Sequence, residues 1–211
     1  MSLRLERFHA FARAQLPSPP ARLLEIGCGD GELALALAAD GYDVTAIDPR
    51  APEGAIFRRL TLEELDDELG FDAIVASLSL HHVENLGVAF DKVASLLPPG
   101  GTLVLQEFAR ERLSGATARW YHEQRRARNE DGVPASFDAW LHESEHDLAD
   151  VHPFDELRRE LDRLFVERVL EEVAYLYSHR LDDAVEPVER ALIEAGTIQA
   201  TGVLYAGELS G

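Results

Sequence analysis

The chain has 211 residues, 46% of them hydrophobic, and a formal net charge of -19 at pH 7. A chain of this length can bury one sizeable core, and its hydrophobic content is typical of a folded chain. A strongly acidic surface repels nucleic acids and anionic membranes, so we expect neither as a partner. The sequence has one cysteine, which excludes an internal disulfide framework.

No apolar run approaches the roughly 20 residues that span a membrane, and the first residues lack the apolar stretch of a signal peptide. We therefore expect a cytoplasmic protein with one domain over residues 1–211. The sequence does not give the oligomeric state, and a homodimer stays an open alternative.

The spacing of apolar residues predicts an amphipathic helix over residues 3–15, within an N-terminal segment 1–20 that ends in three prolines. Residues 22–31 then read RLLEIGCGDG, an apolar run followed by glycines at alternate positions, and helix formers fill residues 32–40. This succession of strand, glycine turn and helix is typical of a nucleotide-type α/β unit. A second predicted strand ends at Asp48, where an acid can hold ribose hydroxyls.

The glycines by themselves leave two cofactors open. Gly29, Gly31 and Ala34 satisfy the relaxed dinucleotide fingerprint that ends in alanine, so NAD fits the pattern. Glu25, however, lies two residues before the first glycine. A carboxylate there would repel a pyrophosphate, whereas it suits a ligand that carries an ammonium and a sulfonium.

The remaining predicted elements follow from periodicity and turn residues. A buried strand lies within the apolar run at 71–83, and a turn rich in proline and glycine separates the helix at 86–97 from a strand at 102–106. The other predicted elements are a short strand at 55–58, helices at 114–130, 136–148, 154–164 and 185–195, and strands at 165–170 and 201–207.

Residues 20–107 resemble the class I S-adenosylmethionine-dependent methyltransferases at several independent places. The stretch Glu-x-Gly-x-Gly-x-Gly at 25–31, the acid at 48, and the blocks at 71–83 and 96–105 all match that family. The resemblance implies a three-layer α/β fold with a Rossmann-like sheet of seven strands, the last antiparallel. It also implies S-adenosylmethionine as the cofactor, and a helical insert at 110–164 that acts as a lid or substrate wall.

The resemblance further implies which residues touch the cofactor. Glu25 would hold the ammonium, Asp48 the ribose hydroxyls, and the end of the fourth strand the reactive part. The full expected set is Glu25, Gly27, Cys28, Gly29, Gly31, Asp48, Pro49, Thr61, Leu62, Ser77 and Leu78. One departure concerns the acid that many relatives carry after the third strand: here Thr61 would bond the adenine amino group and Leu62 would pack on the ring.

Methyl transfer needs a base only when the acceptor is a hydroxyl or a protonated amine. Candidate bases are His81, Glu107, Tyr121 and His122, with His81 best placed because it follows the fourth strand. Each has a structural alternative: His81 as a loop residue bonded to backbone, for example, and Glu107 as a helix cap. The acceptor is expected to be a small molecule that the sequence does not identify.

His142-Glu143-Ser144-Glu145-His146 matches the zinc-protease pattern, and His152 falls at the third-ligand position of one such class. The residues between the two histidines are serine and glutamates, in a segment that looks acidic and exposed. The turn glycine of that class is replaced by Ala149, and Met1 is the only methionine, so the conserved methionine turn cannot form. We expect no metal site.

The sequence thus predicts a methyltransferase, with two alternatives. One is a protein that binds S-adenosylmethionine without catalysis, since the acceptor region is poorly defined. The other is an NAD-dependent oxidoreductase, which the relaxed glycine fingerprint permits.

Overall fold

The computed structural model describes residues 1–67, 69–128, 130 and 132–211, and they build one seven-stranded sheet in the order β3-β2-β1-β4-β5-β7-β6. The first five strands pair in parallel, and β7 runs antiparallel to both β5 and β6. The strands are β1 (Arg22–Ile26), β2 (Asp43–Ile47), β3 (Phe57–Arg58), β4 (Ala73–Ser77), β5 (Thr102–Phe108), β6 (Phe165–Val173) and β7 (Gly202–Leu209). The predicted α/β fold, with a seven-stranded sheet whose last strand is antiparallel, is confirmed.

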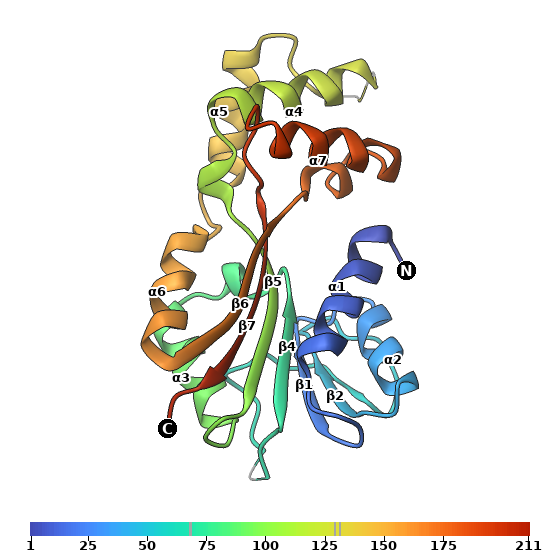
Figure 1. The fold of residues 1–211 in the computed structure, drawn as a ribbon, viewed down its shortest axis with the longest axis vertical. Helices are drawn as coiled ribbons and strands as arrows, with labels where there is room; N and C mark the ends of the chain where they lie inside the picture. The colour runs from blue at the N-terminus through green and yellow to red at the C-terminus, as the bar shows by residue number, and fades with distance from the viewer. Residues whose placement is uncertain (68, 129, 131) are drawn as a thin grey trace.

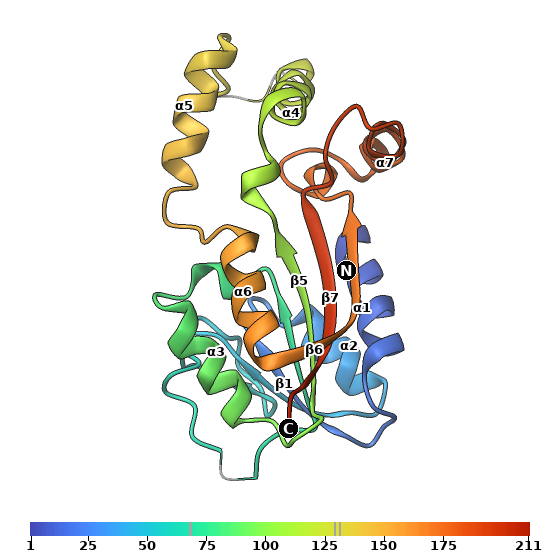
Figure 2. The same ribbon diagram turned by 60° about the vertical axis from the view of Figure 1, so that its left-hand side comes forward.

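Helices cover both faces of the sheet and complete three layers (Figure 2). Helices α1 (Leu3–Gln15) and α2 (Glu32–Ala39) pack on one face, and α3 (Leu86–Ser95) and α6 (Phe154–Leu164) pack on the other. The strand β4 explains this arrangement, because its residues alternate between the two apolar clusters and are fully buried from 73 to 76. A continuous apolar run is what a central parallel strand covered on both faces requires.

Three further helices gather beyond the carboxyl ends of the parallel strands (Figure 1): α4 (Gly115–Ala127), α5 (Phe137–Asp147) and α7 (Glu186–Glu194). The long strands β5, β6 and β7 extend toward them. An apolar cluster separate from the two sheet clusters joins the end of β5 to this group, and includes Phe108, Tyr121, Trp140 and Leu176. The helix predicted at 114–130 ends at Ala127, and Asn129 lies outside the described residues.

Short 3-10 turns connect these parts: η1 (Leu80–His82) after β4, η2 (Arg110–Arg112) after β5, and η3 (Leu176–Ser178) and η4 (Asp183–Val185) between β6 and α7. The helix α1 begins where Ser2 accepts a hydrogen bond from the backbone N–H of Leu5, at 3.4 Å, a normal N-terminal cap. Across the part of the chain that the structure describes, no helix is both long and apolar enough to cross a membrane.

The packing of α3 on the sheet gives a test of the fold. Phe90 is fully buried on α3, whereas Val88 of the same helix is 56% exposed. Replacing Phe90 with alanine removes buried area and leaves a cavity, so it should lower the free energy of unfolding by about 3–5 kcal/mol. Val88→Ala is the matched control and should change it by about 0.5 kcal/mol or less. Urea denaturation measures both, and equal effects would contradict the described packing.

Candidate functional site

The glycine turn after β1 is closely packed on its inner side. Gly27 has a φ of +73°, and a Cβ added there would lie 2.3 Å from the Cβ of Ser79, so only glycine fits. The backbone N–H groups of Gly27 and Cys28 donate to the carbonyl of Ile47 at 2.8 and 3.0 Å. At Gly29, by contrast, an added Cβ meets no described atom within 4 Å. The outer side of the turn is therefore open to a ligand.

Two carboxylates flank this open side. Asp48 accepts hydrogen bonds from the backbone N–H of Gly29 at 3.2 Å and of Arg50 at 2.7 Å. Glu25, on β1, is 2% exposed, and its Oε2 has no hydrogen-bond partner among the described residues. Burial, with smaller contributions from Asp30 and Asp48, raises the pKa of Glu25 to about 8. A buried carboxyl oxygen without a hydrogen-bond partner among the described residues is suited to a cationic ligand.

The lone cysteine lies in the same turn but is not suited to nucleophilic chemistry. Burial, then the neighbouring Glu25, raises the pKa of the Cys28 thiol to about 12. The thiolate is the reactive form, so the side chain packs as a small hydrophobic group.

The end of β4 is held by the N-terminal helix. Arg4 of α1 donates through Nη1 to Ser77 Oγ at 3.1 Å and to Gln106 Oε1 on the neighbouring strand β5. Leu78 follows Ser77 with a φ of +57°. A left-handed backbone is strained for leucine, and such strain occurs most often at functional sites. The sequence did not indicate the contact of Arg4.

The stretch predicted to meet the adenine has a structural role as well. The backbone N–H of Thr61 donates to Glu64 Oε2 at 2.8 Å, and the N–H of Glu64 donates to Thr61 Oγ1 at 3.4 Å, a reciprocal capping arrangement. Leu62 is 4% exposed and belongs to the apolar cluster that contains Ile47. Pro49 is exposed and Thr61 is partly exposed. The adenine contacts of Thr61 and Leu62 and the cofactor contact of Pro49 stay predictions.

A cavity of about 680 Å³ lies at the carboxyl ends of β4 and β5, under the helices α4 and α5. The side chains around it come from the strand ends, these two helices and the segment around η3, and include Leu78, His81, Phe108, Tyr121, Trp140 and Tyr175. Several rings stack on one another: the ring centroids of Phe108 and Tyr175 are 5.1 Å apart, and those of Tyr175 and His179 are 6.2 Å apart. The cavity is the size of a small-molecule site.

His81 and Glu107 form a hydrogen-bonded pair at this cavity. Nδ1 of His81 bonds Oε2 of Glu107, and Oε1 of Glu107 accepts the backbone N–H of Leu80 at 3.0 Å. Glu107 is fully buried, and His81 lines the cavity. With Nδ1–H of His81 donating to the carboxylate, Nε2 is the ring atom that can accept a proton. The pair has the geometry of a general base and its orienting acid.

The other two candidate bases are engaged elsewhere. The hydroxyl of Tyr121 donates to the carbonyl of His179 at 2.7 Å, and burial raises the pKa of Tyr121 above its usual value. Nε2 of His122 bonds the carbonyl of Pro134 at 2.8 Å, and His122 is not among the described residues that line the cavity. Catalytic roles for both stay predictions, and the geometry favours His81.

The zinc-protease pattern lies on α5 and the loop that follows it. His152 bonds the carbonyl of Val83 through Nε2 and the carboxylate of Glu156 through Nδ1, both at 3.0 Å. Its backbone N–H donates to the carbonyl of His81 at 3.0 Å. His152 thus fastens the loop before α6 to the turn η1. Within the residues that the structure describes, no three His, Cys, Asp or Glu side chains are placed to hold a metal ion.

Several cavity residues had no predicted role, among them Phe108, Trp140, Leu176 and Arg180. Aromatic residues and histidines are frequent in the chain beyond Phe108, and this was the only sequence signal for them. Such residues fill cores as often as they line sites, so their position had to come from the fold.

Comparison with known proteins gives a consistent picture. A family model described as a methyltransferase domain matches residues 1–164. An uncharacterized methyltransferase of Mycobacterium tuberculosis (strain ATCC 25618 / H37Rv) is 36% identical over 113 residues, 48% of this chain and 57% of the relative. A ubiquinone biosynthesis O-methyltransferase of Xanthomonas campestris pv. campestris (strain B100) is 37% identical over 116 residues, 47% of this chain and 48% of the relative. The chain spans about half the length of these curated relatives.

Solved structures share the fold at low sequence identity. An N-methyltransferase of Bradyrhizobium japonicum in complex with S-adenosyl-L-homocysteine has a TM-score of 0.58 and 18% identity, covering 98% of this chain and 87% of that one. The 1,6-didemethyltoxoflavin-N1-methyltransferase of Burkholderia thailandensis, with bound 1,6-didemethyltoxoflavin and S-adenosylhomocysteine, has a TM-score of 0.61 and 17% identity, covering 99% of this chain and 79% of that one.

The buried carboxyl of Glu25 predicts a pH-dependent stability. Its pKa is about 8 in the folded protein and 4.5 without burial, so the fold retains a proton that the unfolded chain releases between these values. Glu25 therefore does not change the free energy of unfolding below pH 4.5. As the pH rises from 4.5 to 8, Glu25 lowers this free energy progressively. Glu25→Gln should raise the free energy of unfolding by about 2–4 kcal/mol at pH 8 and by little near pH 4.5.

Urea denaturation at the two pH values measures this difference. Glu6→Gln, at an exposed position on α1, is the matched control and should show no such pH dependence. A variant at Glu25 with the same stability as the wild type at both pH values would contradict the burial of an unpartnered carboxyl.

Proposed function

The chain belongs to the methyltransferase domain family, and we propose that it transfers a methyl group from its cofactor S-adenosylmethionine to a hydroxyl group of a small molecule. One observation carries the proposal: a cavity of small-molecule size opens at Leu78, the last of the residues expected at the cofactor, and the His81–Glu107 pair lies beside it. Ligands of open α/β sheets sit outside the carboxyl ends of the strands, where these parts meet.

The residues around the glycine turn fit the cofactor. Glu25 would hold the ammonium, because its Oε2 is buried without another partner among the described residues. The open side at Gly29 would let the methionine part lie against the backbone. Asp48 would accept both ribose hydroxyls, since a carboxylate has acceptor capacity beyond the two N–H groups it already binds. The solved structures with S-adenosylhomocysteine support this choice of cofactor.

When bound, the cofactor supplies an electrophilic methyl group on a good leaving group, so the protein mainly positions and desolvates the acceptor. His81 would take the proton of the acceptor hydroxyl at Nε2 as the methyl group is transferred. Glu107 would keep the imidazole oriented and stabilise the imidazolium that forms. A base of this kind has a purpose for a hydroxyl acceptor and little for a neutral amine, which favours oxygen as the methylated atom.

The segment 110–164 would act as a wall of the acceptor site, since α4 and α5 contribute Tyr121 and Trp140 to the cavity. The stacked rings of Phe108, Tyr175 and His179 also line the cavity and suit a flat, largely apolar molecule. One similar relative is named an O-methyltransferase, which agrees with a hydroxyl acceptor.

Cofactor binding is the first test. Asp48→Ala removes the group proposed to hold the ribose, so calorimetry should show S-adenosylhomocysteine binding weakened by more than about 1 kcal/mol, roughly fivefold or more. Asp43→Ala, at an exposed position of β2, the strand that Asp48 follows, should bind as the wild type does. Binding of NAD with no response to S-adenosylmethionine or its product would overturn the proposal in favour of an oxidoreductase.

The role of His81 is tested once a metabolite screen has found an acceptor that the wild type methylates. His81→Gln should lower the rate of transfer by about 10²–10⁴-fold and leave S-adenosylhomocysteine binding unchanged, because only proton transfer is lost. His142→Gln, on α5 and away from the cavity lining, is the control and should keep the rate. Full activity of His81→Gln would exclude it as the base, and no turnover of any acceptor would favour a non-catalytic binding protein.

A further inference from the structure

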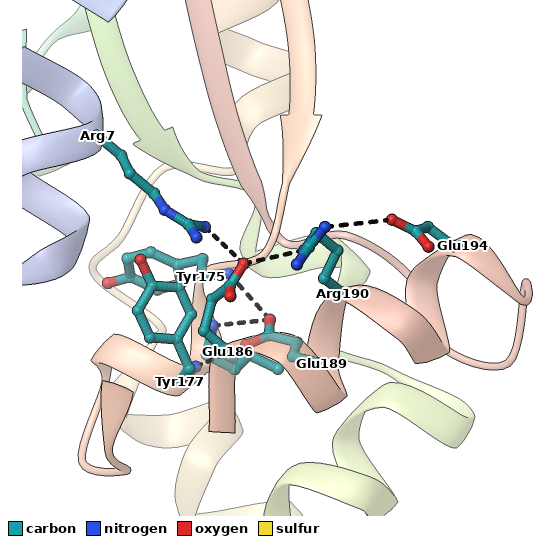
Figure 3. Close-up of polar contacts among 8 residues, drawn as sticks. Arg7, Tyr175, Tyr177, Glu186, Glu189, Arg190 and Glu194 are labelled. Atoms are coloured by element: carbon teal, nitrogen blue, oxygen red, sulfur yellow. Dashed lines mark hydrogen bonds and ion pairs between the residues drawn. The ribbon is translucent and has the colours of Figure 1, made fainter. Parts of the chain in front are cut away.

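The helix α7 carries two buried carboxylates, Glu186 at 2% and Glu189 at 0% exposure (Figure 3). Neither residue lines the cavity, and neither follows from the expected methyltransferase motifs. Acids are almost never fully buried unless other groups bind them. We therefore expect each of the two carboxylates to have a structural or functional role.

Glu189 holds the turn η3 by its backbone. Oε1 accepts the N–H groups of Tyr175 and Leu176, both at 2.9 Å, and Oε2 accepts the N–H of Tyr177 at 2.7 Å. Three successive N–H groups thus converge on one carboxylate (Figure 3). Tyr175 and Leu176 line the acceptor cavity, so the position of this wall depends on Glu189.

Glu186 joins the same helix to α1. Its Oε1 accepts Nη1 of Arg7 at 2.5 Å and lies 3.3 Å from Nε of Arg190 (Figure 3). The carboxylate is buried, and the Arg7 hydrogen bond lowers the pKa of Glu186. The Arg7 side chain is 49% exposed, so water screens the pair in part, and its charge-assisted hydrogen bond joins α1 to α7.

The helix α1 also touches the proposed cofactor edge. Arg4 binds Ser77 at the end of β4 and Gln106 on β5, and the amino group of Met1 lies 3.3 Å from Oε1 of Glu32, the first residue of α2. The same helix thus contacts the strand end expected at the reactive part of the cofactor and, one turn later, the carboxylate of Glu186.

We propose that Glu186 and Glu189 are positioning residues that couple the cofactor edge to the wall of the acceptor cavity. A ligand at Ser77 fixes the position of α1. The Arg7–Glu186 pair then fixes the position of α7, and Glu189 fixes the turn that carries Tyr175 and Leu176. The acceptor wall is then complete only when the cofactor edge is occupied, so the cofactor binds before the acceptor. This inference rests on the proposed function.

Hydrogen exchange of the full chain with and without saturating S-adenosylhomocysteine tests the coupling. In the wild type, the ligand should slow amide exchange at residues 175–177 by about fivefold or more. Arg7→Gln and Glu186→Gln should still bind the ligand by calorimetry but lose most of that slowing. Arg7→Lys, which keeps the charge, should restore it, a rescue that a merely structural role does not predict.

Two variants complete the test. Arg13→Gln removes an arginine of α1 that lies 3.3 Å from Asp40 of the segment after α2, so the slowing should persist. Glu189→Gln replaces an acceptor oxygen with an NH₂ group, and residues 175–177 should exchange faster with or without ligand. Ligand-induced slowing that is absent in the wild type, or undiminished in Arg7→Gln, would overturn the coupling while the proposed function stands. Failure of the wild type to bind S-adenosylhomocysteine would overturn both.

Discussion

The structure depends on the contact between Gly27 and Ser79. A side chain at Gly27 would overlap the Cβ of Ser79, and Ser79 Oγ donates to the carbonyl of Ile26 at 2.7 Å. This contact joins the end of β1 to the segment after β4, the two central strands where the direction of strand addition reverses. Glu25 and Asp48 lie beside the glycine turn, and His81, two residues after Ser79, lines the cavity. A cofactor bound at the turn would therefore have its reactive end beside the acceptor.

The buried carboxylates differ in whether other groups of the protein bind them. Glu107 and Glu189 are fully buried and bound by an imidazole or by backbone N–H groups, so each fixes the position of a neighbouring segment. Glu25 is also buried but has an oxygen without a partner among the described residues. Burying an unpaired acid reduces stability, and proteins retain such groups mainly where a ligand uses them. The contrast separates carboxylates that fix neighbouring segments from the one that we propose binds the cofactor.

Periodicity and turn residues were sufficient to predict most elements. The helix expected at 3–15 and the helix expected at 154–164 have those bounds in the structure, because prolines and an apolar stripe define their ends and faces. The partner of His81 was not predictable, since Glu107 lies 26 positions away and meets it only through strand pairing. Nothing in the local sequence distinguishes Glu186 and Glu189 from exposed acids of the same helix type. Their burial follows from packing against α1 and η3, which no local pattern records.

The central claim is that cofactor and acceptor sites meet at Leu78. A crystal structure of the protein with S-adenosylhomocysteine tests it most directly. We expect the ligand's carboxylate-bearing end to lie along the glycine turn, its ribose to lie at Asp48, and its sulfur to face the cavity lined by Leu78 and His81. A ligand bound elsewhere, or one whose sulfur is separated from this cavity by protein, would contradict the proposed arrangement.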